Sequence, residues 1–212
     1  MFTPKFTISK EGVRWFGGFL LLGLVLIPFT LTGAGIALVL GILACLFFRI
    51  PLRYPPQDVG LVLSPADGKI VCIDEVNEPL FVKNQCKRIS IFLSIFDVHM
   101  NYAPVTGIID WIAYQKGRFH WAFEPKASEA NENQRIGIST SLGKILLRQI
   151  AGTVARRIVL FKNVTQSVQG GERIGMIKFG SRVEIYIPEN FPLKVRLGDR
   201  VAGGLTVLAQ AS

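Results

Sequence analysis

Cysteine, histidine and charged residues are all scarce in this chain of 212 residues. Three cysteines are too few for a disulfide scaffold, and Cys45, Cys72 and Cys86 do not have the spacing of metal ligands. Two histidines, His99 and His120, argue against a histidine-rich metal centre. Charged residues make up 18% of the chain and hydrophobic residues 50%. This balance excludes intrinsic disorder, because disordered chains combine low hydrophobicity with high charge.

The longest segment without charge runs from Trp15 to Phe48. About 20 apolar residues cross a bilayer as one helix, so this run is too long for one span and too short for two full ones. Residues that bend or interrupt a helix gather at its centre, Pro28–Gly35. They favour a helical hairpin with the arms Phe16–Leu31 and Gly33–Phe48. A single tilted helix, kinked at the proline, is the alternative.

Basic residues flank the apolar run on both sides, which predicts that both of its ends lie in the cytoplasm. The run is too long for the hydrophobic region of a cleaved signal peptide. A net charge of +9 attracts polyanions, and beside such a run the expected partner is an anionic membrane surface rather than nucleic acid. We therefore expect residues 1–56 to anchor the protein at the cytoplasmic face of the cell membrane, with a catalytic domain at residues 57–212.

Short β-branched segments bounded by Gly, Pro and Asn follow the anchor and predict strands of about 5–7 residues. These segments are Gly68–Ile73, Arg88–Leu93, Gly107–Ala113, Arg157–Phe161 and Ser181–Ile187. The apolar run Gly143–Gly152 fits a strand or a helix, because short apolar runs are ambiguous. Polar, aperiodic Lys126–Arg135 is interpreted as a loop. The predicted fold class is mainly β, within α+β, behind the N-terminal hairpin.

A weak internal repeat lies near the end of the chain. Gly171–Ile177 and Gly198–Gly204 share a glycine, an acid, an arginine and a β-branched residue. Each predicts a tight turn that leads into a strand, with the glycine at positive φ. Such turns resemble those of the lipoyl/biotinyl carrier-like β-sandwich, and two unrelated β-turns are the alternative.

Three short patches could carry chemistry. Asp67 lies in a turn that opens a predicted strand, and His99 lies in an apolar stretch, where an imidazole could act as a general base near neutral pH. Gly180 and Ser181 lie between two predicted strands. A glycine carbonyl is open to attack by a hydroxyl, but a serine hydroxyl needs a neighbouring base. Taken singly, each patch is better explained as an ordinary turn or a buried residue, and His120, between aromatic residues, is interpreted as packing.

The motifs together resemble the short-form phosphatidylserine decarboxylases. They are SPADGKI at 64–70, FDVHMNYAPVTG at 96–107 and RIGMIKFGSRVEIYIP at 173–188, with further likeness at Phe47–Pro51, Asn133–Arg135 and Gln149–Ile158. Each motif is weak alone. Their shared order and spacing make the resemblance specific, and it extends from the anchor to Leu208.

The resemblance implies a self-cleaving proenzyme. Ser181 Oγ attacks the Gly180 carbonyl, His99 acts as the base, and Asp67 is the carboxylate that orients the imidazole. Cleavage gives a β chain of residues 1–180 and an α chain of residues 181–212, which remain together as a heterodimer. Ser181 becomes a covalent pyruvoyl group that forms a Schiff base with phosphatidylserine. This group accepts electrons as CO2 leaves, and the product is phosphatidylethanolamine. No metal is implied.

One position departs from the pattern of the longer family members, which have a second histidine three residues before the motif histidine. Phe96 stands there, so the proton donor in the decarboxylation step is unassigned. A serine hydrolase could use the same three residues, but Phe179–Val183 does not have the G-x-S-x-G setting of its nucleophile. A non-catalytic carrier or lipid-binding β-domain is another alternative, and an ether lipid with a serine head group is an alternative substrate.

Overall fold

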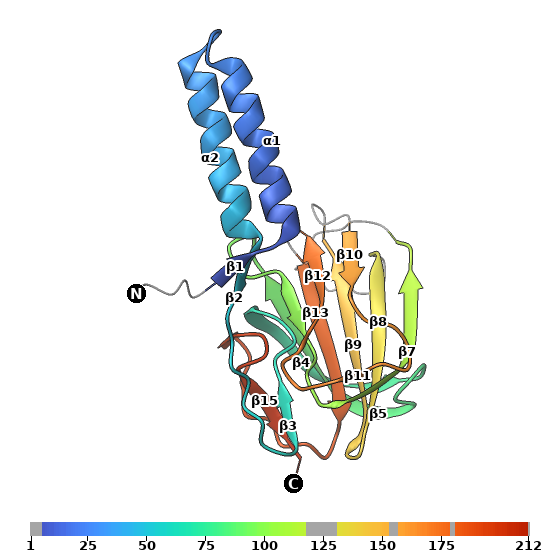
Figure 1. Ribbon diagram of the computed structural model, residues 1–212. Coiled ribbons are helices and arrows are strands. Elements are labelled where there is room, and N and C mark those ends of the chain that lie inside the picture. Colours follow the sequence, from blue (N-terminus) through green and yellow to red (C-terminus); the bar gives the residue numbers. More distant parts are fainter. Residues whose placement is uncertain (1–5, 118–130, 153–156, 179–180, 212) are drawn as a thin grey trace. The chain divides into compact units, whose positions relative to one another are not determined.

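The computed structural model describes residues 6–117, 131–152, 157–178 and 181–211 (Figure 1). The chain forms two compact units, Met1–Leu52 and Arg53–Ser212. The division falls four residues before the predicted boundary, which followed residue 56. The reason is that Arg53 is ion-paired with Asp67 inside the second unit.

The first unit contains two helices, α1 (Lys10–Leu26) and α2 (Leu31–Phe47), and two short strands, β1 (Phe6–Ile8) and β2 (Arg49–Pro51). The strands pair antiparallel. Each helix begins at a capping hydroxyl: Ser9 Oγ accepts a hydrogen bond from Gly12 N–H at 3.2 Å, and Thr30 Oγ1 accepts one from Gly33 N–H at 3.3 Å. The helix limits therefore follow the caps and differ by up to six residues from the arms predicted from hydropathy.

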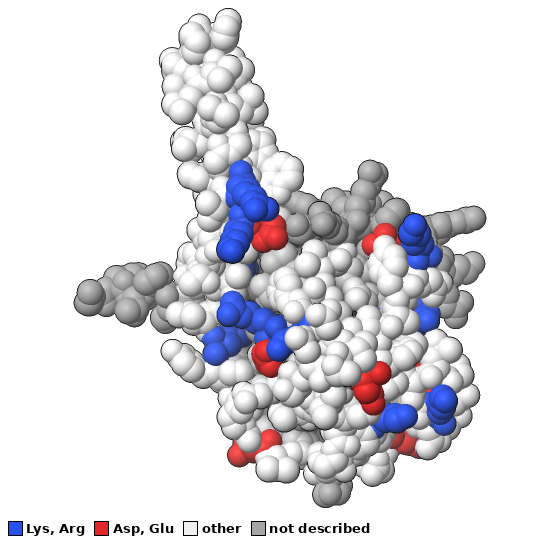
Figure 2. All heavy atoms as spheres, turned by 45° about the vertical axis from the view of Figure 1, so that its right-hand side comes forward, with Lys and Arg blue, Asp and Glu red and all other residues white. Residues whose placement is uncertain are grey.

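The two helices lie side by side and antiparallel (Figure 1). A small residue marks the close approach, since a Cβ atom on Gly41 would lie 3.2 Å from both Phe16 and Phe19. Large apolar side chains are exposed along both helices. On the face seen in Figure 2, no charged side chain lies over the half of the pair that contains the α1–α2 connection. Among the residues described, neither helix combines the length and the apolar character that crossing a bilayer requires.

The second unit is built on an eight-stranded antiparallel sheet of order β11-β7-β8-β9-β13-β5-β4-β14, with a three-stranded sheet β10-β12-β6 and a pair β15-β3. The strands are β3 (Leu61–Leu63), β4 (Gly68–Glu78), β5 (Asn84–Leu93), β6 (Met100–Tyr102), β7 (Gly107–Gln115), β8 (Asn133–Thr140), β9 (Gly143–Ala151), β10 (Arg157–Leu160), β11 (Ser167–Val168), β12 (Arg173–Lys178), β13 (Ser181–Pro188), β14 (Arg200–Val201) and β15 (Val207–Gln210). The mainly β prediction is confirmed.

All five segments predicted as strands lie in strands, and the ambiguous run after Gly143 is strand β9. The predicted length of 5–7 residues is too short for β4, β5 and β7, which have 11, 10 and 9 residues, and β10 ends at Leu160 rather than at Phe161. The predicted loop is wrong at Asn133–Arg135, which open β8. Backbone pairing with β7 and β9 holds these polar residues extended, and such pairing does not depend on side-chain polarity. Residues 126–130 of that loop lie outside the described residues. Both turn glycines have the predicted positive φ, 79° at Gly171 and 93° at Gly198, and each turn leads into a strand.

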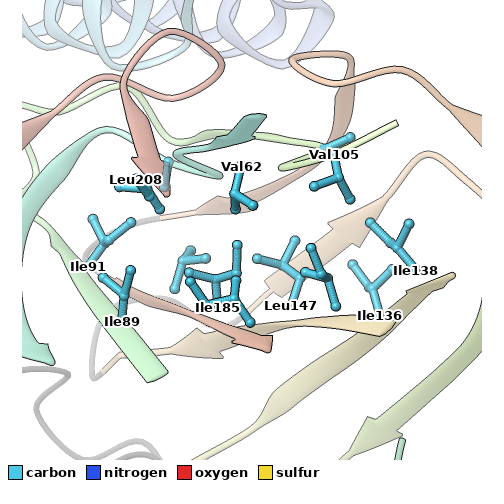
Figure 3. Close-up of a cluster of buried hydrophobic side chains, with 14 of the residues drawn as sticks. Val62, Ile89, Ile91, Val105, Ile136, Ile138, Leu147, Ile185 and Leu208 are labelled. Carbon is cyan, nitrogen blue, oxygen red and sulfur yellow. The ribbon is translucent and has the colours of Figure 1, made fainter. Parts of the chain in front are cut away.

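One face of the large sheet carries the hydrophobic core (Figure 3). Val183, Ile185 and Ile187 on β13 point into it, together with β-branched and leucine side chains from β5, β8 and β9. Because side chains alternate along a strand, Ser181 lies on the same face as Val183. The residue that opens β13 therefore points toward the interior of the second unit.

Candidate active site

Four neighbouring strands end or begin together at one end of the large sheet. Ser181, the first residue of β13, pairs with Leu93, the last residue of β5. The β4 register, Lys69 with Phe92, brings Gly68 level with Leu93, and Val201 of β14 pairs with Gly68. Asp67 directly precedes β4, and the loop that contains His99 directly follows β5. Ser181, Asp67 and the start of the loop that contains His99 therefore lie at the same end of the sheet.

The hydroxyl of Ser181 is fully buried, with 0% exposure, and has no hydrogen-bond partner among the described residues. Its strand is paired on both sides, with Leu93 and with Ala151. A buried polar group without a partner is unusual in a native protein, and such groups mark strain or chemistry. Gly180, the predicted carbonyl partner, lies outside the described residues.

His99 is 1% exposed, and its Nδ1 lies 2.8 Å from the backbone oxygen of Asp97. A carbonyl oxygen only accepts, so Nδ1 carries the hydrogen, and the lone pair of the neutral ring is on Nε2. The His99 backbone oxygen accepts a hydrogen bond from Ile177 N–H of β12 at 3.2 Å. The loop 94–99 therefore begins beside Ser181 and ends beside the strand that leads to Gly180.

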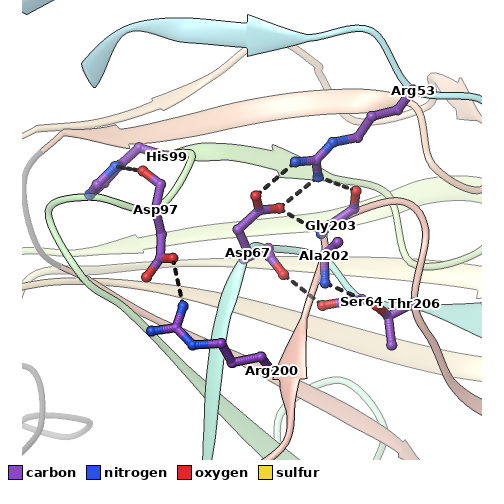
Figure 4. A network of polar contacts seen from close by, with 10 residues as sticks. Arg53, Ser64, Asp67, Asp97, His99, Arg200, Ala202, Gly203 and Thr206 are labelled. Carbon is purple, nitrogen blue, oxygen red and sulfur yellow. Dashed lines mark hydrogen bonds and ion pairs between the residues drawn. The ribbon is translucent and has the colours of Figure 1, made fainter. Parts of the chain in front are cut away.

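Asp97 holds this loop in shape (Figure 4). Its Oδ2 accepts hydrogen bonds from Ser94 N–H at 2.8 Å and Ser94 Oγ at 2.7 Å, and its Oδ1 accepts one from Arg200 at 3.3 Å. Asp97 and Arg200 were not predicted from the sequence to lie at the site. In Ser94-x-x-Asp97, the aspartate is spaced so that its side chain can accept hydrogen bonds from the serine and close a turn, so the sequence contained a signal for Asp97.

Asp67 forms a two-pronged ion pair with Arg53, Oδ1 to Nη1 at 2.6 Å and Oδ2 to Nη2 at 2.7 Å. Its Oδ1 also accepts a hydrogen bond from Gly203 N–H at 2.7 Å. Figure 4 shows that these contacts, rather than a bond to His99, occupy the carboxylate. The Asp97 carbonyl is one group that orients the His99 ring. The relay from Asp67 to His99 stays a prediction.

The Arg53 side chain is buried among these partners. Its guanidinium also donates to the Gly203 carbonyl and lies 5.0 Å from the centre of the Tyr102 ring. Burial alone would lower the pKa of Arg53, but the hydrogen bond and the charge of Asp67 outweigh it and raise that pKa. Burial likewise raises the pKa of the Tyr102 hydroxyl. Arg53 is therefore charged and Tyr102 neutral at physiological pH.

Two buried amides lie on the core side of the sheet near Ser181. Gln149 Nε2 donates to Asn101 Oδ1 at 2.7 Å, and Gln149 pairs across the sheet with Val183. Asn101 Nδ2 and Gln149 Oε1 have no partner among the described residues. They offer one free donor and one free acceptor close to the serine. From the sequence, Gln149 is singled out only as the first residue of the segment Gln149–Ile158 that resembles the family.

The remaining predicted positions do not join the described site. Phe96, which stands in place of a second histidine, is 78% exposed, and His120 lies outside the described residues. Within the described ranges, no three His, Cys, Asp or Glu side chains form a group that could hold a metal ion.

Comparison with known proteins links the chain to one family. The sequence profile for phosphatidylserine decarboxylase matches residues 40–209. A phosphatidylserine decarboxylase proenzyme of Desulfotalea psychrophila is 39% identical over 218 aligned residues, which cover 99% of both chains. Its counterpart in Carboxydothermus hydrogenoformans is 45% identical over 189 residues, 85% of this chain and 89% of that one. The matched region contains Asp67, His99 and Ser181.

Proposed function

Since the chain belongs to the phosphatidylserine decarboxylase family, and is thereby an enzyme that decarboxylates phosphatidylserine, we propose that it activates itself by cutting between Gly180 and Ser181. The observation that carries this proposal is the buried, unpartnered hydroxyl of Ser181 at the start of β13. The described strands β12 and β13 end and begin on either side of Phe179 and Gly180. The nucleophile is therefore adjacent in sequence to the carbonyl that it attacks.

His99 is the proposed base. Its Nδ1–H donates to the Asp97 carbonyl, so the lone pair that takes the proton from Ser181 Oγ is that of Nε2. The attack forms an ester between Ser181 Oγ and the Gly180 carbonyl and breaks the Gly180–Ser181 amide bond. Removal of a Cα proton from residue 181 then expels the Gly180 carboxylate. The nitrogen of residue 181 leaves as ammonia after water adds, and residue 181 becomes a pyruvoyl group.

Ser181 fits the role of precursor because its side chain is already desolvated and bound to no other described group. When formed, the pyruvoyl group supplies an electron sink for the decarboxylation of the substrate amine. Asn101 and Gln149 would orient polar atoms of the substrate with their free amide groups. The burial of this end of the sheet would exclude water from the reacting carbon.

We further propose that the two products of cleavage stay together as an α/β heterodimer. Residues 181–212 contribute β13, β14 and β15, which pair with β5 and β9, with β4 and with β3. Every one of these partner strands lies before residue 180. The arrangement also fits the carrier-like β-sandwich suggested by the turn repeat.

Intact mass analysis of the purified protein tests this proposal. We expect two fragments that co-purify under native conditions and separate on a denaturing gel. The smaller one, residues 181–212, should be lighter than a serine-initiated peptide by the mass of one ammonia molecule and resistant to Edman degradation. A free serine at its N-terminus would indicate ordinary proteolysis instead.

The first unit is proposed to hold the enzyme at the cytoplasmic face of the cell membrane. A helix that is apolar all around is stable in a lipid or protein interior rather than in water, and α2 contains no charged residue. A helical hairpin inserted in the lipid would keep the enzyme near a substrate that cannot leave the bilayer cheaply, since each buried CH2 contributes about 0.8 kcal/mol. Basic residues around the apolar run favour the anionic surface.

Removal of residues 1–52 tests this role. Self-cleavage should continue, because the second unit, including Arg53, remains intact. Turnover of phosphatidylserine in vesicles should fall about tenfold or more, since a loss of only about 1.4 kcal/mol in membrane binding has that effect. Turnover of a short-chain, dispersed analogue, measured in parallel, should change little. Equal losses on both substrates would show that residues 1–52 shape the active site instead.

A further inference from the structure

Arg53 is the first residue of the second unit, and its side chain joins three separate parts of that unit. It holds both oxygens of Asp67, donates to the Gly203 carbonyl and covers the Tyr102 ring. Only 9% of its side chain and 16% of that of Asp67 are exposed. Gly203 in turn donates its N–H to Asp67, so the three residues form a closed set of contacts (Figure 4).

These contacts fix the orientation of the Asp67 carboxylate. A carboxylate has about four acceptor positions, and the described residues fill three of them, two from Arg53 and one from Gly203. The position that no described residue fills is on Oδ2. A guanidinium fixes the plane of the carboxylate because it donates through a rigid fork, which a lysine ammonium cannot do.

We infer that Arg53 is a positioning residue for self-cleavage, which acts through Asp67 by fixing the orientation of this carboxylate at the end of the sheet. This inference rests on the proposed function, in which Asp67 supports the base His99. Arg53 directly follows Leu52, the last residue of the first unit, and its side chain contacts Asp67 at the start of β4.

A second arginine–aspartate pair provides the matched control. Arg88 and Asp74 also form a two-pronged pair, but they lie directly opposite each other on β5 and β4, which are already joined by backbone hydrogen bonds. Their side chains are 25% and 36% exposed. This pair resembles the Arg53–Asp67 pair in chemistry and lacks its place at the end of the sheet.

The experiment follows self-cleavage of the full chain after cell-free synthesis, by gel. R53Q should cleave about 10- to 100-fold more slowly, the cost of a misplaced catalytic group. R53K keeps a charged donor to Asp67 without the rigid fork, so its rate should fall less than that of R53Q. R88Q should cleave as the wild type does.

The outcomes separate this inference from the proposed function. A wild-type rate in R53Q, or faster cleavage, overturns the inference while an uncut S181A chain preserves the proposal. Equal slowing in R53Q and R53K also overturns it, because a charged donor to Asp67 would then make no difference to the rate. If R53Q does not fold in a thermal melt, R53K compared with R88K decides, and equal rates in those two variants count against Arg53. Cleavage of S181A refutes the proposed function itself.

Discussion

Replacement of Ser181 by alanine is expected to leave one uncut chain with no decarboxylase activity. The substitution removes both the nucleophile of the proposed cleavage and the atoms from which the catalytic group forms. The fold should survive, because the Ser181 hydroxyl bonds to no other described residue and its removal leaves no described partner unsatisfied. A denaturing gel, intact mass and an assay of CO2 release measure the result, and the melting temperature should be at least that of a wild-type chain.

Ser90 provides the control for this experiment. It is also a buried serine, 1% exposed, on the neighbouring strand β5, but its hydroxyl contacts Glu184 on the other face of the sheet. Ser90→Ala should therefore cleave normally, with at most a modest loss of stability. A Ser181→Ala chain that still splits at residue 180 would refute the assignment of the nucleophile.

The second large effect is expected at the base. His99→Ala should slow self-cleavage by about 10²- to 10⁴-fold, the usual contribution of a positioned general base. Asp67→Ala should also slow it strongly, because it removes the carboxylate that the proposal places behind the base. His120→Ala should cleave at the wild-type rate, since that residue was assigned only to packing. The rates come from the loss of the full-length band after cell-free synthesis.

Two results would contradict this scheme in different ways. Blocked cleavage in His120→Ala with normal cleavage in His99→Ala would reverse the assignment of the base. Slow cleavage in His99→Ala with normal cleavage in Asp67→Ala would show that the Asp97 carbonyl orients the imidazole without help from the carboxylate.

The strands could be predicted because their signal is local. Alternation of β-branched residues identifies β13 from Ser181 onward, and the turn glycines mark the starts of β12 and β14 in the same way. The helices begin at other residues than predicted because the capping side chains of Ser9 and Thr30, rather than the limits of the apolar run, determine where they start. The first residues of β8 were missed because their extended conformation comes from pairing with distant strands.

The contacts of the site could be predicted only in part. Motif order marked Asp67, His99 and Ser181 as candidates, and the strand registers place Ser181, Asp67 and the start of the His99 loop at one end of the sheet. The partners of Asp67 are 14 and 136 residues away in sequence, and nothing local marks Arg53 or Gly203 as those partners. Contacts of this kind depend on the packed fold, because side chains far apart in the chain meet only after the sheet has formed.

The place of β13 between β5 and β9 also determines which residue reaches the chemistry. A shift of one residue along either neighbour would turn Arg182 toward the core and Ser181 away from it, because side chains alternate along a strand. Such a shift would put a guanidinium among isoleucines and lose the contacts on the opposite face, where Glu184 lies near Arg182. The register of the hydrogen bonds on both sides of β13 therefore fixes which side chain faces the core at its first residue. In the proposed mechanism, the choice of one peptide bond for cleavage then depends on the stability of this central strand.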